Sequence, residues 1–262
     1  MRRYLSLYYH FLLQRLKILM EYRVNFIIGA SSTVFLQISG ILTIWVVMRQ
    51  VPSLNGWSFD EVLLIYGLVT LAKSINHMFA DNLWTIGRQY IRTGGFDRFL
   101  VRPIDPLFHL LADRFCHDGM GNFLIGLILV VKSTLGLDIP WTPLNLLYLV
   151  VAVLSGGLIF IALNLITGVS AFWIMDAVPV MRVVFDNHLF AQYPISIYPK
   201  AISIWLTWLV PYAFASFYPA SHLLGRDVGA LAWLGPAVAA VLLILGYRFW
   251  RFGLQHYAGT GS

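Results

Sequence analysis

Long apolar stretches without charged residues dominate the hydropathy pattern of this 262-residue chain. The hydrocarbon core of a bilayer requires roughly 20 apolar residues in a helix, and an uncharged apolar stretch of 18 or more is typical of a membrane span. The pattern therefore predicts an all-α integral membrane protein. The stretches without Asp, Glu, Lys or Arg are 24–48, 139–175, 201–225 and 228–247.

Six transmembrane helices follow from this pattern. The position of the fifth is open: residues 177–197 carry Arg182 and Asp186, whereas 201–225 is uncharged but contains two prolines. Hydropathy alone favours 201–225, and the other segment then becomes interfacial or re-entrant, which is tolerated where protein buries it. The predicted spans are 24–48, 59–80, 115–137, 143–172, one within 177–217, and 229–249.

Residues 1–23 have a different, amphipathic pattern. At 100° per residue, polar and basic residues from Arg3 to Glu21 fall in one stripe, and leucines and Tyr9 lie opposite. We expect an interfacial helix whose apolar face lies in the headgroup boundary. The remainder, 24–262, forms one membrane domain with a polar loop at about 81–114.

The net charge of +6 arises from an uneven distribution of basic residues. The side that carries most of them faces the cytoplasm under the positive-inside rule, so both termini are expected there. Because membrane orientation explains this charge, we expect no nucleic-acid partner. That side holds Arg2, Arg3, Arg15, Lys17, Arg23, Arg88, Arg92, Arg98, Arg102, Arg114, Arg248 and Arg251, and the other holds Arg49, Lys132 and Arg226.

Catalytic, metal and cofactor motifs are not found in the sequence. There is no HExxH, GxSxG or GxxxxGK[ST] string, so the chain is not expected to bind a nucleotide through a P-loop. The chain has one cysteine, and its histidines show no ligand spacing. We expect no bound cofactor. The one cluster open to an acid–base interpretation, against a simple polar helix start, comprises Asp113, Arg114, His117 and Asp118.

Ionisable residues inside spans are costly and often mark transport pathways. Lys73 lies within the second span, and we expect it either to extend to the interface or, less simply, to contact a substrate. Arg182 and Asp186 are four positions apart, so they neutralise each other if 177–197 is a helix.

Three motifs resemble one transporter family. Glu21, Tyr22 and Arg23 precede the first span, and the string YPISIYP occupies 193–199, followed by Pro-Tyr at 211–212 and Tyr-Pro-Ala at 218–220. The loop after span two contains a G-x-F-D-x-x-L-x-R-P string at residues 94–103, which includes Gly95, Asp97, Leu100, Arg102 and Pro103. Together they resemble the ABC-type exporter permeases of the type-2 superfamily.

This resemblance implies a non-catalytic permease subunit of the cell membrane. It would pair with a second permease chain, a heterodimer being favoured over a homodimer, and with cytoplasmic subunits that hold ATP and Mg. The loop would be the coupling segment, with Phe96 and Phe99 as apolar anchors for the ATPase and Arg98 and Arg102 as its charges. The implied coupling residues are Arg92, Gly94, Gly95, Phe96, Asp97, Arg98, Leu100, Arg102 and Pro103.

The same resemblance places span five at 177–197 and a re-entrant segment at 199–222, against hydropathy. Asp176, Arg182 and Asp186 become candidate pathway residues, and the cargo expected from the family is a small amphipathic or drug-like compound. Two other classes remain: a lipid-modifying membrane enzyme centred on Asp113–Asp118, and an ion-coupled secondary transporter.

Overall fold

The computed structural model describes residue 7 and residues 23–51, 53–116, 118–174 and 176–257. Within these residues the chain is helical, apart from loops and one isolated bridge between Leu54 and Trp57. The prediction of an all-α protein is confirmed. The predicted interfacial helix at 1–23 falls outside the described residues except for residues 7 and 23.

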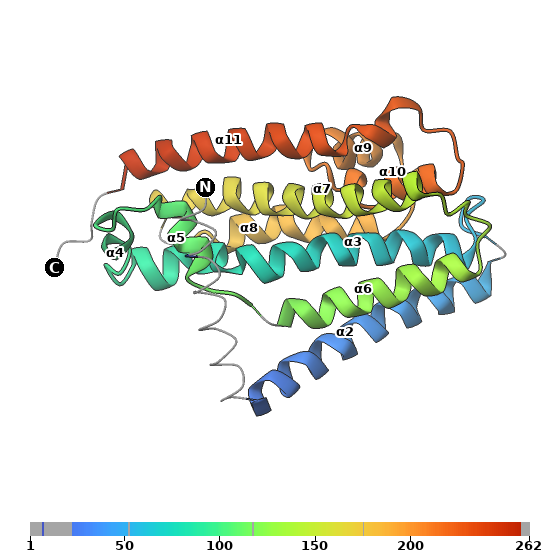
Figure 1. Cartoon of the computed structure of the whole chain (residues 1–262), viewed down its shortest axis with the longest axis horizontal. Coiled ribbons are helices and arrows are strands. Elements are labelled where there is room, and N and C mark those ends of the chain that lie inside the picture. Colours follow the sequence, from blue (N-terminus) through green and yellow to red (C-terminus); the bar gives the residue numbers. More distant parts are fainter. Residues whose placement is uncertain (1–6, 8–22, 52, 117, 175, 258–262) are drawn as a thin grey trace.

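The five longest helices of the described chain run along the longest axis of the molecule, with the first of them inclined to the other four (Figure 1). Four segments of the described chain are long and apolar enough to cross a membrane: 59–91, 118–135, 143–172 and 235–255. A shorter apolar helical stretch covers Val34–Gln50. The helices are α2 (Arg23–Gln50), α3 (Phe59–Ala80), α6 (Asp118–Leu135), α7 (Pro143–Gly168) and α11 (Gly235–Gln255).

Helix starts are encoded locally. Before α3, the Ser58 hydroxyl accepts from the Glu61 backbone N–H at 3.4 Å, and the Glu61 carboxylate accepts from the Ser58 N–H at 2.8 Å. This capping box satisfies donors that a helix N-terminus otherwise leaves open. The Thr142 hydroxyl caps α7 by accepting from the Asn145 N–H at 3.2 Å, with Pro143 at the first helical position, where its missing N–H costs nothing.

Helix α3 is the central helix, and it packs against both α6 and α7. Small residues permit this close approach. A Cβ on Gly126 of α6 would lie 2.9 Å from the Leu71 backbone nitrogen, and one on Gly157 of α7 would lie 2.7 Å from the Ile75 Cβ. Neither position accepts a larger side chain without separating the helices.

The fifth span is where the hydropathy prediction is wrong. Residues 201–225 do not form one helix, because the chain turns at Pro211, which has no N–H to donate, and again at Ser216. Residues 178–192 form α8 (Val178–Phe185) and the 3-10 helix η4 (Asp186–Gln192), which contact α7 and α3 respectively. The pieces of 200–223 are α9 (Lys200–Ile204), η6 (Trp205–Leu209), η7 (Tyr212–Ala215) and α10 (Phe217–Leu223).

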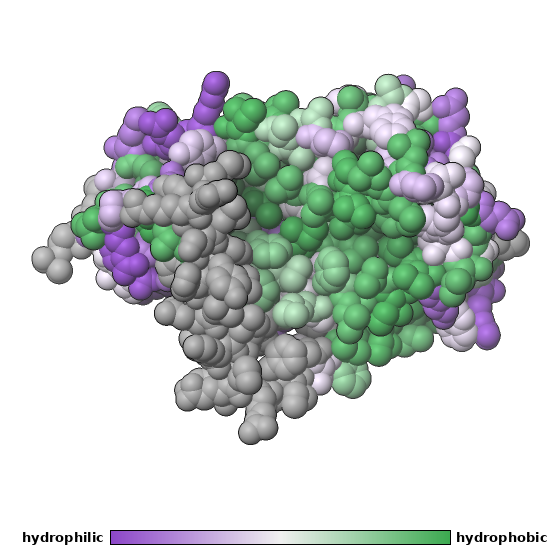
Figure 2. Space-filling view, viewed as in Figure 1, coloured by the Kyte–Doolittle hydropathy of each residue, from purple (hydrophilic) through white to green (hydrophobic). Residues whose placement is uncertain are grey.

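The bundle has two different ends (Figure 1). One end, here called the α4–α5 end, comprises 81–114 with the ends of α3, α7 and α11; it contains η1 (Asp81–Thr85), the π-helix η2 (Ile86–Ile91), α4 (Asp97–Leu100) and α5 (Pro106–Ala112). The opposite end holds the connections at 51–58, 136–142 and 224–234, including η8 (Gly229–Trp233). In Figure 2, hydrophobic residues cover the middle of the visible face and hydrophilic residues gather at both ends, as expected for a membrane protein.

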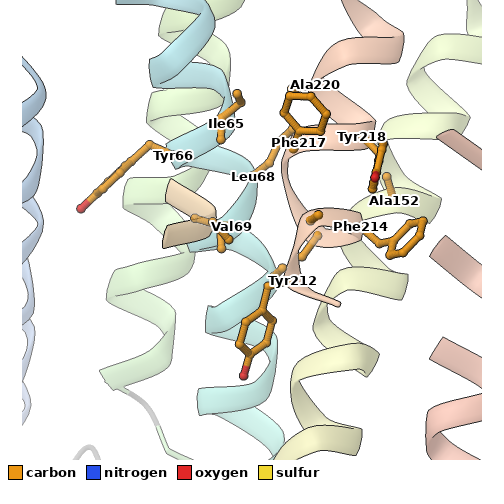
Figure 3. Packing of buried hydrophobic residues seen from close by; sticks show 14 of the residues in the cluster. Ile65, Tyr66, Leu68, Val69, Ala152, Tyr212, Phe214, Phe217, Tyr218 and Ala220 are labelled. Carbon is orange, nitrogen blue, oxygen red and sulfur yellow. The ribbon is translucent and has the colours of Figure 1, made fainter. Parts of the chain in front are cut away.

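Two buried clusters form the interior. The larger one fills the body between α3, α7 and the 206–223 segment, where Phe160 stacks on Tyr212 with ring centroids 4.2 Å apart. Figure 3 shows Phe214 and Phe217 on one side of α3 and Tyr66 leaving the helix on the other. The smaller cluster joins the α4–α5 end to α11 through Phe96, Phe172 and Trp250.

Candidate functional site

A cavity of about 600 Å³ with many polar lining residues lies on the side of α3 from which Tyr66 projects, opposite to Phe214 and Phe217 (Figure 3). It is bounded by α2, α3, α6, α8 and η4, and also touches η1. A volume of this size suits a drug-sized ligand. Its polar and charged lining residues are Gln37, Tyr66, Lys73, Asn76, His77, Asp81, Asn122, Arg182, Asp186, His188 and Gln192.

A chain of hydrogen bonds links three helices along this cavity. The Tyr66 hydroxyl donates to Gln37 Oε1 at 2.6 Å, and Gln37 Nε2 donates to Asn122 Oδ1 at 2.7 Å. Asn122 Nδ2 then lies 3.4 Å from His77 Nδ1. Each amide both accepts and donates, so the chain fixes α2, α3 and α6 relative to one another.

Lys73 was expected to extend to the membrane interface, but its side chain lines the cavity and meets His188. Its ammonium nitrogen lies 3.3 Å from His188 Nε2 in η4. The His188 Nδ1 lies 2.7 Å from the Phe185 carbonyl oxygen and donates to it, which leaves Nε2 as the acceptor for Lys73. Among the described ion pairs none joins Lys73 to a carboxylate.

The structure separates Asp176 from the other two predicted pathway residues. Arg182 and Asp186 both line the cavity, but in the described chain no ion pair within 4 Å joins them. Asp176 is not among the residues lining this cavity; it lies at the α4–α5 end and accepts a bidentate pair of hydrogen bonds from Arg88 at 3.1 and 2.7 Å. These hydrogen bonds lower the pKa of the Asp176 carboxyl.

The acid–base interpretation of Asp113–Asp118 assumed a continuous helix, and that assumption is wrong. Residues 113–116 lie between the end of α5 and the start of α6 and belong to neither helix, so the four-residue spacings do not place these side chains on a common helix face. Asp113 accepts from Arg98 at 2.8 Å, and Arg114 lies 3.6 Å from Asp81. His117 falls outside the described residues.

The predicted coupling segment turns sharply in its middle. Gly94 has a φ of +69°, a left-handed conformation that glycine adopts at little cost, and the Phe96 N–H returns to the Tyr90 carbonyl at 3.0 Å. A four-residue helix, α4, follows from Asp97, and the chain then reaches Pro103 and α5. Gly94 therefore turns the chain between η2 and α4.

Phe96 and Phe99 are not exposed anchors, which corrects the expectation for them. Both are fully buried within their own chain. Phe96 packs against Phe172, Trp250 and Tyr257 with centroid distances of 5.4, 6.1 and 5.0 Å. They form the floor of the segment, and the outward apolar side chains are Leu100, 44% exposed, and Val101, 80% exposed.

Charged residues surround these exposed side chains. Arg102 Nη1 donates to His109 Nε2 at 3.1 Å, and the Asp97 carboxylate accepts from the Tyr257 hydroxyl at 2.9 Å. Arg92, Arg98 and Pro103 are also exposed. The predicted coupling residues are thus brought to one surface, except Phe96 beneath it. Of the predicted interfacial residues, Glu21 and Tyr22 fall outside the described chain, and Arg23 begins α2.

Sequence reasoning missed the residues that complete the cavity wall. Gln37, Tyr66, Asn76 and Asn122 are polar but uncharged, so an inspection of charged residues passed over them. The feature that could have identified them is a polar side chain within a predicted apolar span. His77 and Asp81 were also missed, although their spacing of four places them one turn apart.

These features define a class: a polytopic helical membrane protein with a polar cavity beside its central helix and a basic surface at one end. The family model described as "ABC-2 family transporter protein" matches residues 12–261, nearly the whole chain. The protein therefore belongs to the ABC-2 transporter family. Membership implies a multi-pass membrane subunit that associates with ABC ATPase subunits. No curated protein and no solved structure matches the chain.

Proposed function

We propose that this chain is the non-catalytic permease subunit of an ATP-driven exporter of the cell membrane. Family membership and one structural observation support the proposal. The segment 92–103 presents exposed arginines, Leu100 and Val101 on a buried aromatic floor at one end of the bundle. Such a rigid surface with a small apolar centre and a charged rim suits docking to an ATPase subunit.

The polar cavity is the proposed cargo pathway. Its lining includes residues of α2 and of the α8–η4 segment, and α2 also carries the exposed side chains of Phe35 and Leu36. A second permease chain would cover these side chains and close the cavity. We favour a related but unequal chain, giving a heterodimer.

The proposed cargo is a small amphipathic or drug-like compound. The cavity combines apolar side chains such as Leu36 and Phe185 with charges of both signs on Arg182 and Asp186. A ligand with an apolar body and one polar or ionised group therefore finds complementary contacts.

Six spans are part of the proposal, with both termini in the cytoplasm. The α4–α5 end then faces the ATPase, and α8 with η4 forms the fifth span. Residues 199–222 form a re-entrant segment near the opposite end. ATP and Mg would be held by the partner ATPase subunits, whose closure would move the 92–103 surfaces and switch the cavity between two arrangements.

The test is co-purification with candidate ATPase subunits in detergent. Asp97→Arg combined with Arg102→Glu should abolish co-purification, because both side chains lie on the proposed docking surface. Asp138→Arg combined with Lys132→Glu makes the same charge changes at the opposite end, where both residues are exposed, and should leave it intact. Equal co-purification of both variants would contradict the docking surface.

An ion-coupled transporter is the second candidate, because buried polar chains can carry protons across a membrane. The observation that favours it is the chain from Tyr66 through Gln37 and Asn122 to His77. Reconstituted vesicles would decide between the two: export that requires ATP and an ATPase subunit supports the exporter, and cargo movement driven by a proton gradient alone supports the alternative.

A further inference from the structure

Three potential metal ligands meet where the cavity reaches the α4–α5 end. His77 lies in the last turn of α3, Asp81 is the first residue of η1, and Cys116 precedes α6. His77 Nε2 is 3.4 Å from Cys116 Sγ and 3.7 Å from Asp81 Oδ1. All three ligand atoms lie within 4.8 Å of one another.

These separations suit a tetrahedral ion. Zinc bonds of about 2.0–2.3 Å to nitrogen, oxygen and sulfur at tetrahedral angles put neighbouring ligand atoms roughly 3.3–3.7 Å apart. The two measured distances from His77 fall in that range. The third separation, between the Asp81 oxygen and Cys116 Sγ, reaches the same range after a small movement of either side chain.

The backbone already holds the ligands in place. His77 and Asp81 are one turn apart at the end of α3, so their side chains share a face. The Cys116 N–H donates to the Met78 carbonyl at 3.2 Å, which ties the loop before α6 to the same turn. The site therefore needs no folding step on binding.

We propose that His77, Asp81 and Cys116 bind a divalent transition metal of the zinc type. Thiolate and imidazole ligands favour zinc over magnesium or calcium, which prefer oxygen. On binding, the Cys116 thiol releases its proton to solvent and the sulfur forms a bond to the metal. His77 and Asp81 also line the cavity, so the fourth coordination position faces it and the ion has an entry path.

The surroundings leave the proposed ligand atoms available. Arg114 lies 3.6 Å from the second oxygen of Asp81, Oδ2, so Oδ1 is free to face the metal while the guanidinium orients the carboxylate. On the other side, Asn122 adjoins His77 Nδ1. A half-turn of the Asn122 and Gln37 amides reverses the donors and acceptors up to Tyr66, so that Nδ1–H donates to Asn122 and Nε2 is left for the metal.

Cobalt titration of the full-length chain tests this site. The tag-free protein is stripped with a chelator in detergent, titrated with Co²⁺, and then challenged with Zn²⁺. We expect one Co²⁺ per chain, a thiolate-to-cobalt charge-transfer band, and displacement by Zn²⁺ but not by Mg²⁺. Because Cys116 is the sole cysteine of the chain, that band reports this residue without any variant.

Variants then test Cys116 and His77 as ligands. Cys116→Ser should remove the charge-transfer band, and His77→Gln should weaken Zn²⁺ binding at least about tenfold, the loss that even outer-shell changes cause. His256→Gln, at an exposed position near the end of the described chain, should bind as the wild type does. Absence of the band in the wild type, or unchanged Zn²⁺ affinity in His77→Gln, would overturn the proposal. Neither readout depends on ATP or cargo, so the result is independent of the exporter proposal.

Discussion

The two ends of the bundle are stabilised by different kinds of contact. At the opposite end, Arg226 makes a 2.7 Å ion pair with Glu61, donates to the Gly56 carbonyl at 2.9 Å and lies 3.9 Å above the Trp57 ring. The Trp57 indole in turn donates to Ser196 at 3.0 Å. Polar contacts between distant segments lock this end.

The α4–α5 end reverses that arrangement. Its interior is aromatic, with Phe96, Phe99 and Trp250 fully buried, and its charges lie outside. The Arg98–Asp113 and Arg88–Asp176 pairs are partly open to solvent, and surface pairs of this kind add little stability. The comparison teaches that an arginine holds distant segments together at one end, whereas at the α4–α5 end the arginines lie at the surface around an aromatic interior.

The largest effect is expected from Phe96→Ala. Removing a fully buried aromatic side chain costs about 3–5 kcal/mol, so this variant should unfold well before the wild type in detergent. Thermal denaturation followed by circular dichroism measures the change. Leu100→Ala on the exposed surface is the control; an equal loss in both variants would mean that the aromatic floor is not what stabilises this end.

Arg226→Ala should have an intermediate effect. It removes the ion-pair partner of the partly buried Glu61 carboxylate, which then keeps, among the described residues, only the Ser58 N–H, at a cost of about 1–3 kcal/mol. Arg226→Lys retains the charge but not the forked geometry, so it should lose less. The same denaturation assay ranks the three proteins. If Arg226→Ala is as stable as the wild type, polar contacts do not lock the opposite end.

Acid should weaken the α4–α5 end through His109. Burial, and then the Arg102 guanidinium, lower the pKa of His109 in the folded protein. Below about pH 6.5, the ordinary pKa of histidine, the unfolded state therefore binds more protons than the folded state. The free energy of unfolding then decreases as the pH is lowered. Denaturation at pH 7.5 and 5.5 should show a smaller pH effect in His109→Asn, whereas the exposed control His256→Gln should keep the wild-type dependence.

Arg92→Gln should have the smallest effect on stability. The side chain is exposed, and such substitutions usually stay within about 0.5 kcal/mol. Its association with ATPase subunits should nevertheless weaken, which co-purification measures. A large stability loss with unchanged association would contradict our assignment of docking to the exposed arginines and of stability to the buried aromatic residues.

Local patterns determined much of this protein. The predicted spans agree with α2, α3, α6 and α7 to within a few residues, except at the C-terminal end of α7, which is extended by a 3-10 turn (η3, Val169–Phe172). The last helix, α11, begins and ends six residues later than its predicted span at 229–249, because residues 229–233 form the separate 3-10 helix η8. The three motifs together resembled the family whose model matches the chain. Such features depend on neighbouring residues and on the thickness of a bilayer, so the sequence alone contains them.

Only the tertiary structure decided which side of each helix faces the interior and which polar side chains meet there. Hydropathy could not show that Phe96 and Phe99 face inward, that Lys73 meets His188, or that 201–225 breaks into short helices. Nor could it bring His77 to Cys116, 39 positions away in the chain. A membrane makes most spans apolar on every side, so periodicity is weak there, and only packing against neighbouring helices fixes which polar side chains meet.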